Sequence, residues 1–66
     1  MKNAILDALE DRYTAQISEA DATIKIYLEN SVGIGEHSDV MEAIEKELDM
    51  VAKYHDQIEI LQKYFK

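Results

Sequence analysis

The sequence predicts an all-α fold, an antiparallel hairpin of two long helices that dimerises into a four-helix bundle. Apolar residues recur at alternating steps of three and four along both halves of the 66-residue chain, which is the spacing of one helix face. The two glycines, Gly33 and Gly35, lie near the middle, and proline is absent. Two amphipathic helices joined by a short loop must pack antiparallel. We therefore expect one unit, residues 1–66, with its loop at about residues 31–38.

The first helix is expected from about residue 3 to about residue 30. Asn3 can cap its N-terminus, and Asp7 suits the positive end of the helix dipole. One apolar stripe runs down this helix and is expected to belong to the core of the oligomer. The stripe consists of Leu6, Leu9, Tyr13, Ile17, Ala20, Ile24 and Tyr27.

The second helix is expected from about residue 39 to about residue 65. Asp39 and Glu42 have the spacing of a capping box, and Lys63 suits the negative end of the helix. Its stripe is a strict heptad seam of the kind found in coiled coils, and it too is assigned to the oligomer core. The apolar members of the seam are Met41, Ile44, Leu48, Val51, Ile58 and Phe65. The residues that flank it and widen the apolar face are Val40, Ala52, Tyr54 and Leu61.

Two polar residues, His55 and Gln62, interrupt this heptad seam. Polar residues at core positions can fix the register or the oligomeric state, and a histidine between two copies can make assembly depend on pH. Alternatively, each hydrogen-bonds locally, or lies at the edge of the seam while Tyr54 and Leu61 take the core. We favour the second interpretation.

Association is expected because the apolar faces are broad. Two helices that touch along one line leave much of each face in water, whereas two hairpins enclose a core. A symmetric homodimer is the commonest arrangement for such chains. The first helix also carries alanines every seven residues away from its main stripe, either as good helix formers on a solvated surface or as a face for a further protein partner. This possible partner face consists of Ile5, Ala8, Ala15, Ala22 and Ile26.

The net charge of -7 is spread over both halves of the chain and argues against two classes of partner. Nucleic acids and anionic membranes would be repelled, and the basic residues are isolated rather than clustered. No stretch approaches the ~20 apolar residues of a membrane span, and the N-terminus lacks the apolar run of a signal peptide. We therefore expect no nucleic-acid partner, no membrane partner and a cytoplasmic location.

No catalytic site and no cofactor are expected. The segment Gly33-Ile34-Gly35 lacks the third glycine and the lysine of a phosphate-binding loop, so we interpret it as a tight turn. No serine or lysine lies in a nucleophile motif with a histidine, and the absence of cysteine excludes a disulfide. Glu36, His37 and Asp39 carry donors that could ligate a metal, but adjacent polar residues at a helix start are usually caps.

The segment from Tyr27 to Asp39, YLENSVGIGEHSD, resembles the loop of small uncharacterised helical-hairpin proteins of tailed bacteriophages. The resemblance covers this loop and the heptads beside it, and that pattern has proline where this chain has Ser31 and Ser38. The family implies no assigned activity. It implies a viral accessory or structural protein, which would act in the host cytoplasm.

The function that these observations favour is a non-enzymatic one. The chain is expected to be a protein–protein interaction or structural accessory protein that acts as a homo-oligomeric helical bundle. The alternative is an acidic inhibitor, which would mimic the charge of a nucleic acid and block a basic site on a host protein. The net charge of -7 motivates that alternative.

Overall fold

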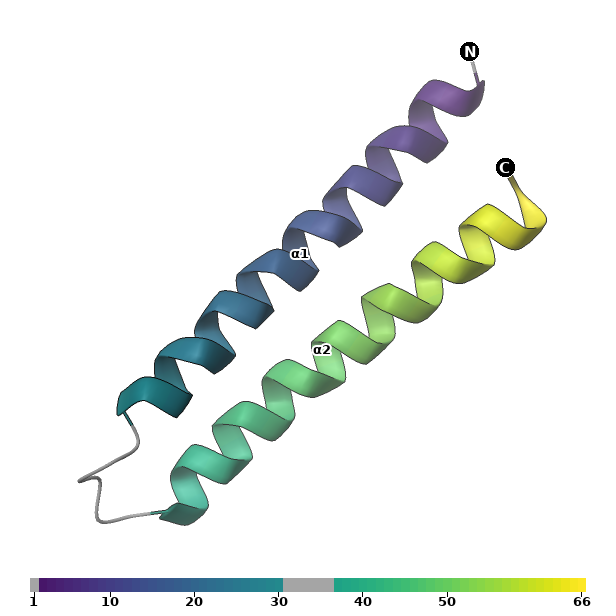
Figure 1. Cartoon of the computed structure of the whole chain (residues 1–66). Helices are drawn as coiled ribbons and strands as arrows, with labels where there is room; N and C mark the ends of the chain where they lie inside the picture. Colours follow the sequence, from purple (N-terminus) through teal and green to yellow (C-terminus); the bar gives the residue numbers. More distant parts are fainter. Residues whose placement is uncertain (1, 31–36) are drawn as a thin grey trace.

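The structure is a computed structural model that describes residues 2–30 and 37–66. These residues form two helices, α1 (Lys2–Asn30) and α2 (His37–Tyr64), which lie side by side and run in opposite directions (Figure 1). The predicted all-α helical hairpin is therefore confirmed. The predicted tight turn Gly33-Ile34-Gly35 lies outside the described residues.

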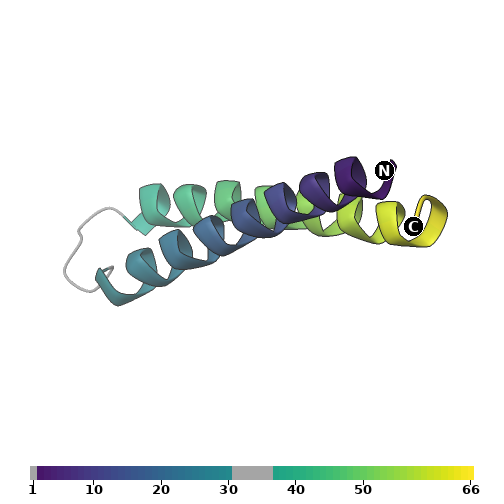
Figure 2. The same ribbon diagram turned by 90° about the horizontal axis from the view of Figure 1, so that it is seen from above.

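The hairpin is long and thin. Its Cα atoms extend over 52 × 15 × 11 Å, and Figure 2 shows that the two helices cross at a shallow angle along most of their length. The radius of gyration is 15.3 Å, whereas a compact domain of this length has one of about 11 Å. We call the end where α1 begins and α2 finishes the open end, and the opposite end the loop end.

Local signals define the helix ends. Near the C-terminus of α1, the Asn30 side-chain amide donates a hydrogen bond of 2.9 Å to the carbonyl oxygen of Ile26. At the end of α2, the backbone amides of Phe65 and Lys66 both donate to the carbonyl oxygen of Leu61, at 3.0 and 3.1 Å. The bonds to Leu61 satisfy one of the four carbonyls that a helix C-terminus leaves without an intrahelical partner, whereas the Asn30 side chain adds a second donor to a carbonyl inside the last turns of α1.

The apolar stripe of α1 faces α2. All seven of its predicted residues are buried or half-buried, and Ala20 is the most deeply buried of them, at 1% exposed. Farther toward the open end, the rings of Tyr13 and Tyr54 stack with their centroids 5.5 Å apart and their planes at 23°. Small and flat side chains thus alternate along the contact, which lets the two helices pack closely.

On α2, the contact with α1 is made one residue before the predicted heptad seam. Leu61 is 7% exposed, and Tyr54 stacks on α1, whereas Met41 and Leu48 are 70% and 52% exposed. The sheltered positions include a heptad series one residue before the seam, together with Ile44, Val51 and Ile58 of the seam itself. The series consists of Val40, Ala43, Glu47, Met50, Tyr54, Gln57 and Leu61. One residue corresponds to about 100° around a helix, so α2 carries two adjacent apolar stripes and packs on α1 through the first.

The second stripe of α2 is only partly sheltered within the chain. Ile44, Val51 and Ile58 are half-buried, and Phe65 is 63% exposed. In the described part of the chain, neither helix has an apolar run that could cross a bilayer.

Candidate functional site

The exposed apolar surface is the candidate functional site. Ala20 and Leu61 are the only buried side chains among the described residues. The single chain exposes 5229 Å². A compact folded monomer of 7.6 kDa exposes roughly 4300 Å², so this hairpin carries an excess of about 900 Å². The exposed large apolar side chains are Ile5, Ile26, Leu28, Met41, Leu48, Ile60, Tyr64 and Phe65.

We call the half of α2 nearer the loop its loop half, and most of its exposed apolar side chains lie on one side, or flank, of the hairpin. A hydrogen bond between the helices identifies which flank this is. Near the open end, the Gln62 side chain donates a hydrogen bond of 3.3 Å to Glu10 of α1. Steps of seven back along α2 lead from Gln62 to His55, Leu48 and Met41, which remain on the same side of a packed helix pair. Met41 and Leu48 therefore extend this flank toward the loop end.

The same flank continues on α1. Steps of seven forward from Glu10 lead to Ile17 and Ile24, both half-buried. The two helices run in opposite directions, so Ile17 and Ile24 lie beside the loop half of α2. We call the surface formed by Ile17, Ile24, Met41, Ile44 and Leu48 the loop-half flank.

The loop-half flank is hollowed on α2. Met41, Ile44 and Leu48 line a shallow open groove together with Glu42 and Glu45. Three apolar side chains within two helical turns, bordered by carboxylates, resemble the apolar centre and polar rim of a protein interface. A side chain from another helix would fit between them in the manner of a coiled coil.

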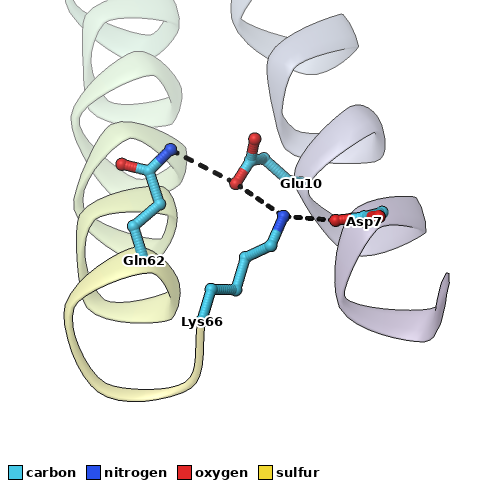
Figure 3. Close-up of polar contacts among 4 residues, drawn as sticks. All are labelled: Asp7, Glu10, Gln62 and Lys66. Carbon is cyan, nitrogen blue, oxygen red and sulfur yellow. Dashed lines mark hydrogen bonds and ion pairs between the residues drawn. The ribbon is translucent and has the colours of Figure 1, made fainter. Parts of the chain in front are cut away.

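Toward the open end the same flank becomes polar (Figure 3). The Lys66 ammonium reaches across from α2 to α1, pairing with Asp7 and, at 3.4 Å, with Glu10. The hydrogen bond to Asp7 raises the pKa of Lys66 above its ordinary 10.5. Partial burial opposes this rise in the pKa, and the charges of Asp7 and Glu10 add to it. With Gln62, these residues form a polar cluster that joins the two helices.

Of the two polar residues that interrupt the predicted seam, Gln62 bonds to the other helix and His55 lies near a carboxylate of its own helix. Gln62 bonds to Glu10, as described, and His55 Nδ1 lies 3.9 Å from a carboxylate oxygen of Glu59, one turn along α2. The side chains of His55 and Glu59 are both about two-thirds exposed, at 67% and 66%. A role for His55 or Gln62 in setting the register of an assembly stays a prediction.

The alanine-rich face of α1 is directed away from α2. Ile5 and Ile26, at its two ends, are 69% and 59% exposed. The alanines between them, Ala8, Ala15 and Ala22, are exposed as well. The structure thus leaves this face accessible, and its use by a further partner stays a prediction.

Metal chemistry finds no support in the described part of the chain. No three histidine or acidic side chains lie close enough together there to hold a metal ion. Of the three candidate ligands, Asp39 is exposed in the first turn of α2. Glu36 and the side chain of His37 lie outside the described residues.

The chain matches no model of a known protein family, no curated protein and no solved structure. The resemblance of segment 27–39 to bacteriophage helical proteins therefore stays an expectation. What the chain does must be argued from its surface.

Proposed function

We propose that the chain is a non-enzymatic interaction or structural accessory protein that acts as a homodimeric four-helix bundle. The observation that supports the proposal is the excess exposed surface. The hairpin exposes 5229 Å², about 900 Å² more than a compact monomer of its mass, and a standard interface buries about 800 Å² on each partner. One interface of ordinary size would therefore bring the chain to the usual balance of buried and exposed area.

The half-buried stripe residues give a second argument. Tyr13, Val51 and Ile58 are sheltered on one side only, because two helices meet along a line. Burial of a large apolar side chain contributes about 1.5–3 kcal/mol, and half-burial contributes roughly half of that. A second hairpin would supply the missing half along the whole length of the bundle.

Sedimentation equilibrium at micromolar concentration tests the proposal. The expected mass is twice the chain mass of 7.6 kDa. A folded species of 7.6 kDa across the whole concentration range, with the helicity of the hairpin, would overturn it.

A further protein partner would bind the alanine-rich face of α1. Small side chains such as Ala15 let another helix approach closely, and Ile5 and Ile26 would anchor its two ends. A cytoplasmic location belongs to the proposal, within the host cell if the chain is viral as its resemblance implies. This partner would leave the homodimer intact, so pull-down with an Ala15→Arg variant as the control separates the two interactions.

A second candidate function rests on the charge. The net charge is -7, and exposed carboxylates such as Asp11, Glu19 and Asp49 occur along both helices. Such a chain could occupy a basic nucleic-acid site on a host protein by charge mimicry. Binding of that kind weakens steeply as ionic strength rises, because salt screens charges beyond about 10 Å at 0.1 M. Partner binding that is unchanged between low and high salt would exclude mimicry.

A further inference from the structure

We infer that two copies of the chain pair through the loop-half flank, side by side, with both loops at the same end. This inference rests on the proposed homodimer and specifies its interface and direction. It is built on three observations: where the exposed apolar side chains cluster, how large the flank is, and where the polar cluster lies.

Of the exposed apolar surfaces, the loop-half flank is the most continuous. Met41, Ile44 and Leu48 line one groove on α2, and the heptad steps place the half-buried Ile24 of α1 on the same flank. On the outer face of α1, Ile5 and Ile26 are separated by 21 residues, or about 32 Å of helix. Of these two surfaces, only the first has its exposed apolar side chains gathered in one groove. On α1 this flank is bordered by the exposed ion pair of Asp21 and Lys25.

The open end has a third apolar group, but charges lie within it. Ile60 and Tyr64 each lie two residues from Gln62, which places them about 200° around α2 on the far flank. The Lys63 ammonium lies 5.4 Å from the centre of the Tyr64 ring, and Asp56 and Glu59 line the same hollow. Among the described exposed large apolar side chains of α2, none continues this group toward the loop end, because Met41 and Leu48 lie on the opposite flank.

The size of the flank decides how far two copies overlap. The Cα atoms of the hairpin span 52 × 15 Å, so its broad face has a projected area of roughly 800 Å², of the same order as the accessible area that a standard interface buries on each partner. Overlap of the loop halves alone would cover about half of that area, which is characteristic of weak contacts. A stable pair therefore needs overlap along the full length.

The polar cluster then decides the direction. In a symmetric full overlap with opposed loops, each helix would lie on its own counterpart, so Met41 of one copy would lie near Gln62 and Lys66 of the other and Ile24 near Glu10. The charged groups would lose water and gain only apolar neighbours, which is strongly unfavourable. With both loops at one end, apolar side chains meet apolar ones, and Lys66 meets the carboxylates of the second copy as well as its own.

Pulsed electron–electron spin resonance distances between nitroxide labels test the direction. The chain has no cysteine, so a single introduced cysteine carries the only label. Asn3→Cys and Glu29→Cys, made separately, label exposed positions near the two ends of α1. The positions are 26 residues apart, which is about 39 Å along the helix.

Loops at the same end predict a label-to-label distance below about 35 Å for both variants, because each pair is separated only by the width of the bundle. Opposed loops with full overlap predict at least about 39 Å for both variants. Overlap of the loop halves alone predicts a short distance for Glu29→Cys and a much longer one for Asn3→Cys. The second and third results would overturn the inference and leave the homodimer standing.

A pair of charge variants tests the face. Leu48→Glu should reduce the dimer association constant at least 100-fold, because it places a carboxylate in the apolar centre of each interface. Ile26→Glu is the matched control, since Ile26 is as exposed as Leu48 in the single chain, at 59% and 52%, and lies on the outer face of α1. Equal effects of the two substitutions would overturn the assignment of the face. A parent chain that sediments as a monomer would instead overturn the homodimer itself.

Discussion

Truncating Leu61 and Leu48 to alanine separates the contacts that form the hairpin from those that would join two hairpins. Leu61 is 7% exposed within the single chain, whereas Leu48 is 52% exposed. Leucine-to-alanine changes in cores lower the free energy of unfolding by about 2–5 kcal/mol. Here the two helices touch along one line and can move together to fill part of the cavity, so Leu61→Ala should cost about 2 kcal/mol. For Leu48→Ala the contacts within the chain account for about half of that, or about 1 kcal/mol. A covering copy would raise the cost of Leu48→Ala to about 2 kcal/mol per chain.

Thermal unfolding at two chain concentrations distinguishes these cases. If unfolding is coupled to dissociation, each tenfold dilution lowers the stability of the dimer by about 1.4 kcal/mol. For two copies of a 66-residue chain this corresponds to a fall in melting temperature of about 5 °C. The parent and Leu61→Ala should both show the dilution effect. Leu48→Ala should dissociate to monomers at a higher chain concentration than the parent or Leu61→Ala.

Two results would refute this reasoning. A cost for Leu61→Ala well below that for Leu48→Ala would mean that α2 packs on α1 through its second stripe. A melting temperature of the parent chain that does not change on dilution would mean that a single hairpin is stable by itself.

Three further changes test other contacts. Ala20→Leu should lower the free energy of unfolding by about 1–3 kcal/mol in urea titrations, because Ala20 is 1% exposed between the helices; unchanged stability would contradict that close approach. Gln57→Leu should raise the free energy of unfolding by about 1 kcal/mol, since Gln57 Oε1 is buried without a hydrogen-bond partner in the described structure; a lower urea midpoint would count against this. The raised pKa of Lys66 means that its contribution to stability is complete below pH 10.5 and is lost as pH rises through the folded-state value. The melting temperature should therefore fall more in this alkaline range for the parent than for Lys66→Met. Lys53→Met is the control and should follow the parent. Parallel profiles for the parent and Lys66→Met would disprove the contribution of Lys66.

The helices could be predicted from the sequence because their signals are local. A heptad period over both halves and two central glycines are sufficient to place α1 and α2. The expected capping box of Asp39 and Glu42 is wrong in its position, because α2 begins at His37 and Asp39 lies inside the first turn. The stripe of α1 could also be predicted, because the opposite face of that helix carries only alanine, isolated isoleucine and polar residues. There was no competing stripe for α2 to pack against.

On α2 the period alone could not decide which stripe packs on α1. The stripe through Met41 and Leu48 and the stripe through Tyr54 and Leu61 have the same spacing and differ by one residue. The choice depends on contacts across the hairpin, above all the stacking of Tyr54 on Tyr13 and the burial of Leu61. Such contacts require the relative rotation of two helices, which no local pattern contains.

The polar cluster at the open end was not predicted for a similar reason. Lys66 and Asp7 are 59 positions apart, and their pairing depends on the length of the loop and the shift between the helices. Charged residues near helix ends are common, so their presence alone carries no information about this contact. To predict this pairing from the sequence, one would first need to know the register in which the two helices lie against each other.

The tyrosine stack at the middle of the hairpin supplies a built-in optical probe. The chain has four tyrosines and no tryptophan, so tyrosine emission is not masked by a stronger fluorophore. Tyr13 belongs to α1 and Tyr54 to α2, and their rings are 5.5 Å apart only while the helices are together. Near-ultraviolet circular dichroism and tyrosine fluorescence should therefore change when α1 and α2 separate, even when far-ultraviolet circular dichroism still records intact helices. Separation of the two helices can thus be timed independently of the loss of helical structure, without attaching a dye.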